Sequence, residues 1–312
     1  MVNNELDLKE IAQAIYHDAF VNHGDNNDTT GHLDGPDTEL IDKLVESYRQ
    51  SEKETWFINA RDGTKLNAYY KRALKRPEQA SRTVLIIHGI TSQADNTGPW
   101  VSVFEKLGLS VLTPDLRGHG KSATNLRNLG TLDARDMVEW IKEIIKVRGA
   151  SEEIILFGYS LGAATALSAV SYAQKQRINN LKAIIEDCGY SWLEEFVEGY
   201  ILRQYPQLSY AQVPQVKELV DDILQEQQHV TIGSGVSPFV IAECKLPLLI
   251  IHGTEDTTVP ISQAHLIRDI YGAGNESVTT NFVEGANHPQ SIAFGVENYF
   301  VHIKNFLSAL DN

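Results

Sequence analysis

Cysteine is scarce in this sequence of 312 residues, which contains only Cys188 and Cys244. Two cysteines cannot build a four-cysteine zinc cluster, and these two lack the C-x-x-C spacing of metal and redox motifs. A single disulfide could join them, but nothing in the sequence requires one. We expect two free and mostly buried thiols, which fits a reducing compartment.

Positive charge is also in short supply. The chain has 27 Lys and Arg against 41 Asp and Glu, a formal net charge of −14 at pH 7. This balance argues against nucleic acid as a partner, because phosphates attract basic surfaces, and it disfavours anionic membrane surfaces. The composition is otherwise that of an ordinary globular protein, with 42% hydrophobic and 22% charged residues.

Long hydrophobic runs are missing as well. No stretch reaches the roughly 18 apolar residues that a transmembrane helix needs. The first 20 residues lack the basic and then apolar regions of a signal peptide. We expect a cytoplasmic protein with no membrane segment, although a leader or anchor removed from the chain would leave no trace in it. The sequence does not specify an oligomeric state.

Short apolar runs alternate with helical patterns through most of the chain. Such alternation is typical of βαβ units and a parallel sheet buried on both faces. A turn at 61–63 joins two further strands into a hairpin. The apolar runs that predict buried strands are 84–87, 109–113, 154–157, 181–186, 246–251 and 278–283, and the helices expected around them are 131–148, 160–175, 261–271 and 289–309.

Two segments stand outside this alternation. Residues 1–53 contain helical patterns at 5–20 and 39–48, and we expect them to form an N-terminal helical extension. The main domain would then span 54–312. Within it, residues of about 190–243 have helical patterning with Pro206 and Pro214, which predicts a helical insert.

A polar loop follows the first helix. Its residues Asn26, Asp28, Thr30, Gly31 and Asp37 loosely fit the spacing of a calcium loop, but the last position lacks the bidentate Glu of that motif. A solvated loop is the better interpretation, so we expect neither a metal nor a cofactor.

The stretch LFGYSLGAA, residues 156–164, places Ser160 between a predicted strand and a predicted helix. It matches G-x-S-x-G, the nucleophile elbow, in which a sharp turn exposes a serine hydroxyl at the edge of a sheet. Gly158 and Gly162 leave room for the strand and the helix to approach. The motif also arises by chance, so the flanking strand and helix are what favour the functional interpretation.

A serine nucleophile needs a base, and the base needs an orienting acid. Asp256 and His288 each follow a predicted strand, at the edge where open α/β sheets bind ligands. The chain order Ser160, Asp256, His288 is the order expected for this architecture. The plain alternatives are an Asx turn for Asp256 and a surface histidine for His288.

Together, five blocks resemble the α/β-hydrolase family over residues 54–312, most closely its bacterial serine hydrolases and esterases. They are HGI at 88–90, PDLRGHGKS at 114–122, GYSLG at 158–162, GTEDTTVP at 253–260 and GANH at 285–288. The resemblance implies an α/β fold with a mostly parallel sheet of roughly eight strands, helices on both faces and a cap formed by the insert.

The resemblance also implies roles for individual residues. Ser160 would attack the substrate, His288 would accept and return its proton, and Asp256 would orient His288. The alternatives to Asp256 are neighbouring Glu255 and, at lower weight, Asp187. The oxyanion hole would use the backbone N–H groups of Leu161 and Ile90, or of Thr91 if the loop is shifted by one residue. His88 and His252 are expected to be structural.

The chemistry expected is hydrolysis of a carboxylic ester of a small acyl substrate through an acyl-enzyme. A thioesterase, an amidase or a small-peptide hydrolase could use the same three residues. A binding protein that kept the fold without activity is the alternative from another class. Aromatic residues that could line the acyl pocket, each as well explained by core packing, are Trp100, Tyr159, Tyr190, Trp192 and Phe196.

Overall fold

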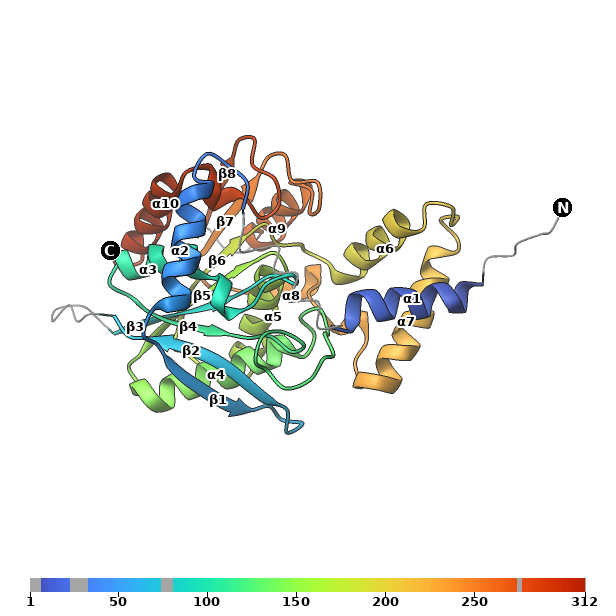
Figure 1. Ribbon diagram of the computed structural model, residues 1–312, viewed down its shortest axis with the longest axis horizontal. Helices are drawn as coiled ribbons and strands as arrows, with labels where there is room; N and C mark the ends of the chain where they lie inside the picture. The colour runs from blue at the N-terminus through green and yellow to red at the C-terminus, as the bar shows by residue number, and fades with distance from the viewer. Residues whose placement is uncertain (1–6, 23–32, 74–80, 274–276, 312) are drawn as a thin grey trace.

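The computed structural model describes residues 7–22, 33–73, 81–273 and 277–311. Its centre is one sheet of eight strands in the order β1-β2-β4-β3-β5-β6-β7-β8 (Figure 1). The strands are β1 (Glu54–Asn59), β2 (Lys65–Lys71), β3 (Arg82–Ile87), β4 (Ser110–Pro114), β5 (Glu153–Tyr159), β6 (Leu181–Asp187), β7 (Leu248–Gly253) and β8 (Val278–Val283).

Six of these strands run parallel to one another. β1 and β2 form the predicted antiparallel hairpin, and β2 also pairs antiparallel with β4. From β4 to β8 every neighbouring pair is parallel. The expected fold class is therefore confirmed, and the carboxyl ends of β3, β5, β7 and β8 meet at one edge of the sheet.

Helices cover both faces of the sheet, because successive side chains of a strand point to opposite faces. On β5, Ile154 and Leu156 pack into one hydrophobic cluster, whereas Ile155 and Phe157 pack into the other. The first cluster includes residues of α4 (Asp133–Arg148), α5 (Leu161–Lys175), α8 (Pro238–Glu243) and α9 (Ser262–Gly272), and the second includes residues of α2 (Thr38–Gln50), α3 (Gly98–Lys106) and α10 (Val296–Ala309).

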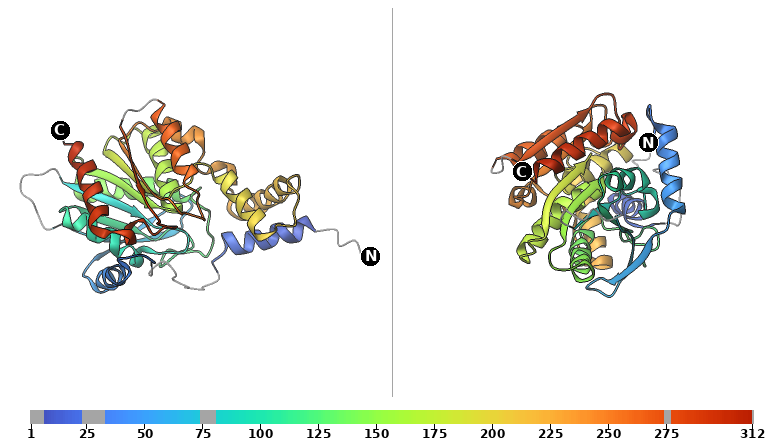
Figure 2. Two further views of the ribbon diagram at one scale, coloured as in Figure 1. Left: turned by 90° about the horizontal axis from the view of Figure 1, so that it is seen from above. Right: turned by 90° about the vertical axis from the view of Figure 1, so that its left-hand side faces the viewer.

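Three helices stand beside the sheet domain as a separate lobe, visible in Figure 1 and in the left view of Figure 2. We call α1 (Leu8–Phe20), α6 (Leu193–Gln204) and α7 (Val213–Gln228) the helical lobe. α1 buries Ile11 and Ile15 and packs along α7. Tyr200 of α6 donates a hydrogen bond to Asp18 of α1. The lobe is therefore built from two segments far apart in the sequence.

The two helices of residues 1–53 thus lie in different places. α2 packs on α3 beside the sheet, where the hydroxyl groups of Tyr48 and Thr113 are 2.7 Å apart. α1 belongs to the lobe and is tied to the sheet domain at its C-terminal end, where the Arg127 amide donates to the Phe20 carbonyl. The N-terminal extension therefore contributes α1 to the helical lobe and α2 to the sheet domain.

Some elements differ from expectation. The helix α3 was not predicted, and the helix expected over 289–309 begins only at Val296. A short 3-10 helix, Ser291–Phe294, precedes it, and Gly295 separates the two with a φ of 154°, outside the helical range. The insert includes α6, α7, the 3-10 helix Ile232–Ser234 and α8.

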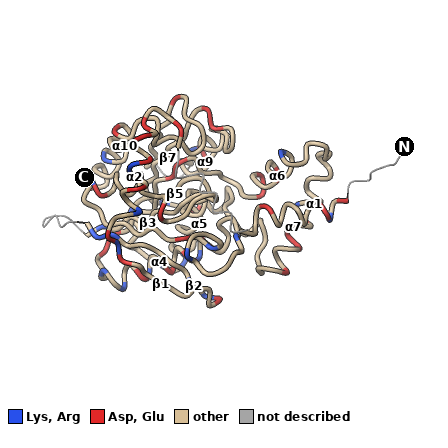
Figure 3. The backbone as a smooth tube through the Cα atoms, in the orientation of Figure 1, with Lys and Arg blue, Asp and Glu red and all other residues tan. Residues whose placement is uncertain are grey.

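Two expectations from composition can be checked directly. Cys188 and Cys244 are both free and buried. In the described part of the chain, no helix is both long and apolar enough to cross a membrane. Figure 3 shows Asp and Glu on the sheet domain and on the lobe, with Lys and Arg interspersed among them, unlike the basic stripe that nucleic-acid binding favours.

Candidate active site

The turn between β5 and α5 gives Ser160 an unusual backbone. Its φ of 56° and ψ of −122° lie outside the regions that non-glycine residues ordinarily occupy. Neighbouring glycines make this turn sterically possible. A Cβ on Gly158 would lie 2.2 Å from the Gly162 carbonyl oxygen, and a Cβ on Gly162 would lie 2.0 Å from the carbonyl oxygen of Ile87 in β3. The sharp elbow predicted from the sequence is present.

Loops after β7 and β8 bring the other two predicted residues to this turn. His288 Nε2 lies 2.7 Å from Ser160 Oγ, and His288 Nδ1 lies 2.7 Å from Asp256 Oδ2. This continuous array of hydrogen bonds joins residues up to 128 positions apart. An imidazole held in this way can accept a proton from the hydroxyl while the carboxylate stabilises the resulting charge.

Both carboxylate oxygens of Asp256 have hydrogen-bond partners. Its Oδ1 accepts hydrogen bonds from the amides of Thr258 and Val259, at 2.9 and 2.7 Å. Burial would raise the pKa of Asp256, but hydrogen bonds from His252 and His288 outweigh burial and lower that pKa to about 2. The carboxylate is thus ionised at every pH at which a histidine titrates.

His252 supports Asp256 from behind, which the sequence did not indicate. Its Nε2 lies 2.8 Å from the Val259 carbonyl oxygen and 3.4 Å from Asp256 Oδ2. Burial lowers the pKa of His252, yet contacts with Asp256 and the charge of Glu186 raise it overall. The expectation that His252 only packs under the loop therefore omitted its contact with the carboxylate.

The rival acids do not bond to His288. Glu255 is exposed. Asp187 is fully buried at the end of β6, where its Oδ2 accepts a hydrogen bond of 2.8 Å from Tyr299. Burial raises the pKa of Asp187 to about 6.

Two backbone amides are positioned near the serine. Leu161 is the first residue of α5, so its N–H has no carbonyl partner within the helix. Ile90 follows Gly89, whose Cβ, if present, would lie 3.4 Å from Ser160 Cβ. Thr91, the alternative donor, is exposed. The loop after β3 therefore lies against the serine, as an oxyanion hole requires.

Several known proteins are similar to this chain. Residues 82–184 match the family model of the alpha/beta hydrolase fold. The uncharacterized protein YqkD of Bacillus subtilis is 25% identical over 273 residues, covering 86% of this chain and 84% of that protein. Human protein ABHD12B is 26% identical over 208 residues, covering 65% of this chain and 52% of its own.

Solved structures share the arrangement of elements. An esterase of Pyrococcus furiosus, Pf2001, superposes with a TM-score of 0.63 at 20% identity, covering 84% of this chain and 92% of that one. The chain has the alpha/beta hydrolase fold. An acylaminoacyl peptidase of Pyrococcus horikoshii superposes with a TM-score of 0.58 at 18% identity, over 84% of this chain and 42% of the peptidase.

The segment PDLRGHGKS stabilises the loops around it through a buried carboxylate. The buried carboxylate of Asp115 accepts hydrogen bonds from the amides of Ala94 and Lys121 and from the side chain of Asn67, at 2.8 to 2.9 Å. Ser122 donates to the Asp115 carbonyl at 2.7 Å. Ser122 is therefore occupied in the turn and is not a second nucleophile.

His119 in the same segment supports the loop of Ile90. Its Nε2 lies 2.6 Å from the Ile90 carbonyl oxygen, and its Nδ1 lies 2.8 Å from that of Arg117. Burial lowers the pKa of His119 to about 4, so the ring is neutral near pH 7. The buried ring therefore anchors the loop that carries Ile90, the expected oxyanion donor.

This anchor leads to a prediction. Replacing His119 by phenylalanine keeps the volume but removes both ring nitrogens, so the Ile90 amide should be held less firmly. We expect kcat to fall about 10- to 100-fold with a small change in KM, because the oxyanion forms only after binding. Steady-state kinetics would test this; a rise in KM at unchanged kcat would instead place His119 in substrate binding.

The aromatic residues weighed as pocket lining are mostly core. Trp100 and Tyr159 are fully buried and stack with ring centroids 4.0 Å apart. Tyr190 is buried and stacks on Phe196 at 4.4 Å. Trp192 alone among these five residues is substantially exposed, at 39%. Packing therefore accounts for most of these side chains.

The suspected calcium loop lies largely in 23–32, outside the described residues. Its last member, Asp37, has a different partner, since Oδ2 accepts a hydrogen bond of 2.7 Å from the Val296 amide. This bond joins the start of α2 to the start of α10.

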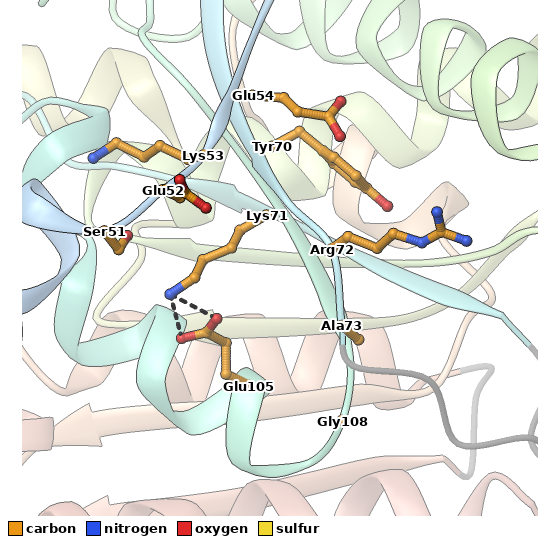
Figure 4. A pocket seen from close by; sticks show the side chains of 10 residues that line it. All are labelled: Ser51, Glu52, Lys53, Glu54, Tyr70, Lys71, Arg72, Ala73, Glu105 and Gly108. Carbon is orange, nitrogen blue, oxygen red and sulfur yellow. Dashed lines mark hydrogen bonds and ion pairs between the residues drawn. The ribbon is translucent and has the colours of Figure 1, made fainter.

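A groove of about 910 Å³ lies at the opposite edge of the sheet (Figure 4). It is lined by residues before β1, at the end of β2 and before β4, whereas Ser160 follows the carboxyl end of β5. Lys71 spans it to Glu105 at 2.8 Å. This groove is separate from the serine site, and its charges of both signs select no ligand class.

Proposed function

We propose that this α/β-hydrolase is a serine hydrolase that cleaves carboxylic esters through an acyl-enzyme. The observation that carries the proposal is the unbroken line from Ser160 Oγ through both ring nitrogens of His288 to Asp256 Oδ2, with both contacts at 2.7 Å. A hydroxyl, a base and an orienting carboxylate in that order are what nucleophilic acyl transfer needs.

In the first half-reaction Ser160 Oγ attacks the ester carbonyl carbon while His288 Nε2 takes the hydroxyl proton. The carbonyl oxygen becomes an oxyanion that accepts hydrogen bonds from the Leu161 and Ile90 amides. Each such donor contributes on the order of 3 kcal/mol to lowering the barrier. His288 then gives its proton to the departing alkoxide, and the acyl group stays on Ser160.

In the second half-reaction water attacks the acyl-enzyme. His288 Nε2 takes a proton from the water and returns it to Ser160 Oγ as the carboxylic acid leaves. Asp256 keeps the Nδ1 proton directed toward itself throughout, which leaves Nε2 free to act as base. No cofactor enters either step.

We further propose that the insert of about 190–243 acts as a cap over the serine, together with α1. The packing of α1 along α7 supports this two-part cap. Caps exclude water and shape the pocket, so the acyl preference would depend on both segments.

The leaving group separates esterase activity from its close alternatives. The test compares kcat/KM for a p-nitrophenyl ester, a thioester and a p-nitroanilide of the same acyl chain, so that only the bond cleaved differs. We expect kcat/KM to be highest for the ester. A higher value for the thioester or the anilide would replace the ester assignment by a thioesterase or an amidase on the same residues.

The rate should depend on the protonation of His288. We expect kcat/KM to fall toward acid, because a base that already holds a proton cannot take one from Ser160 Oγ. Asp256 cannot cause this fall, because its pKa is lowered to about 2.

Two neighbouring acids at the end of β6 could also produce this fall, since burial raises the pKa of Asp187 to about 6 and that of Glu186 to about 7. The controls are therefore Asp187→Asn and Glu186→Gln, each of which should keep the fall in kcat/KM toward acid. A flat profile for the unmodified chain, with chemistry limiting the rate, would argue against His288 as the base.

A further inference from the structure

Beneath the serine lies a cysteine that the proposed reaction does not use. Cys188 directly follows β6, with a φ of 51°, and is only 1% exposed. One ligand atom each from Cys188, Asp256 and His288 lie within 4.8 Å of one another. The side chains of Asp256 and His288 are 0% and 12% exposed. Of the three side chains, that of His288 is therefore the most accessible to solvent.

The donor set has a clear chemical preference. A thiolate, an imidazole nitrogen and a carboxylate oxygen are the three ligand types that zinc takes, at about 2.0 to 2.3 Å, and the thiolate selects against magnesium and calcium. We propose that zinc and similar thiophilic divalent cations bind through Cys188 Sγ, Asp256 and His288 Nδ1, and that this binding inhibits the hydrolysis proposed above. The inhibition rests on the proposed function; the binding does not.

The active and metal-bound arrangements exclude each other. His288 Nδ1 and Asp256 Oδ2 are 2.7 Å apart, close enough for one proton but too close for a metal ion bonded to both at about 2 Å in tetrahedral geometry. Binding must widen this gap, release the thiol proton to solvent and move the single ring proton of His288 from Nδ1 to Nε2.

That change of tautomer is why binding would inhibit. With Nδ1 bonded to the metal and Nε2 protonated, His288 can no longer accept the proton of Ser160 Oγ. Asp256 Oδ1 keeps its bonds to the Thr258 and Val259 amides, so the loop after β7 can persist around the ion. Inhibition would therefore be reversible on chelation.

Binding can be measured without any turnover by using Cd²⁺ as the probe on Ser160→Ala. Ser160 is not among the three ligands, so this variant should bind one Cd²⁺ per chain and show the ultraviolet charge-transfer absorption of a cadmium thiolate. The double variant Ser160→Ala, Cys188→Ala should lose this absorption. Cys244, equally buried but at the end of α8, is the matched control, and adding Cys244→Ala should leave the absorption unchanged.

Two further variants protect this test against a failure to fold. Cys188→Ser keeps the side-chain shape and should also lose the absorption, whereas His288→Gln should weaken Cd²⁺ binding at least about tenfold. Absence of a thiolate band in Ser160→Ala, or its loss with Cys244→Ala instead, would overturn the metal site.

The inhibitory part is tested with Zn²⁺ on chains that retain Ser160. We expect Cys188→Ala to need at least about tenfold more Zn²⁺ for half-inhibition than the unmodified chain, and Cys244→Ala to need the same amount. Equal sensitivity of all three would overturn the inhibition. If the unmodified chain hydrolyses no ester, the proposed function fails, while the Cd²⁺ result still decides the site.

Discussion

Replacing Ser160 by alanine is expected to lower kcat for ester hydrolysis by about 10⁶-fold, the scale on which a serine nucleophile matters. The substitution removes the only hydroxyl within hydrogen-bond distance of His288 Nε2 among the described residues. What remains is catalysis by the oxyanion donors and by binding, worth about 10³ to 10⁴ over water. Initial rates with a p-nitrophenyl ester measure the loss.

The matched control is Ser168, about two turns into the helix that follows Ser160. Ser168 is buried in α5 and its hydroxyl has no hydrogen-bond partner, so Ser168→Ala removes the same atom without removing a contact. We expect its kcat to stay within about twofold, and both variants to keep the melting temperature within a few degrees. Turnover by Ser160→Ala within tenfold of the unmodified chain would contradict the mechanism.

Replacing Asp256 by asparagine should lower kcat by about 10⁴-fold, the effect of the equivalent change in a serine protease. An amide can donate a hydrogen bond to Nδ1, and His288 would then carry its proton on Nε2, where it cannot act as base. The amides of Thr258 and Val259 still bind the remaining oxygen, so the loop should keep its shape. Single-turnover rates would report the chemical step.

Asp187→Asn is the comparison that identifies the acid. Asp187 is the buried last residue of β6 and accepts a hydrogen bond from Tyr299 rather than from His288. We expect it to lower kcat less than tenfold. A larger loss for Asp187→Asn than for Asp256→Asn would move the acid to β6 and require a different position for His288.

Much of the fold was predictable because local chemistry and sheet geometry agree. Fully buried strands read as continuous apolar runs, and their alternation with helices predicts a parallel sheet. Helix α3 was missed because Gly98 and Pro99 at its start read as loop residues and it extends for only nine residues. α10 was extended too far because nothing in its apolar pattern marks Gly295 as an interruption.

The location of α1 could not be predicted from its own residues. Its buried face, with Ile11 and Ile15, indicates that the helix packs against something, but the same pattern would suit the sheet or the lobe equally. The partner is α7, about 200 residues later, which only the three-dimensional structure can reveal.

The candidate site likewise has a part that was predictable from the sequence and a part that was not. Ser160, Asp256 and His288 were predicted because strand ends in a parallel sheet meet at one edge, and the structure brings all three together. The contacts of His252 with Asp256 and of His119 with Ile90 were not predicted, nor was the position of Cys188 near Asp256 and His288. They depend on how loops from different strands pack, and no local motif records that.

The most direct test of the central claim is to identify the residue that reacts with a fluorophosphonate probe. The probe phosphonylates an activated serine, and mass spectrometry of the digested chain locates the adduct. We predict one adduct, on Ser160, that is absent in Ser160→Ala and retained in Ser168→Ala. An adduct on another serine, or no adduct on a chain shown to be folded, would contradict Ser160 as the nucleophile and favour a binding protein that kept the fold.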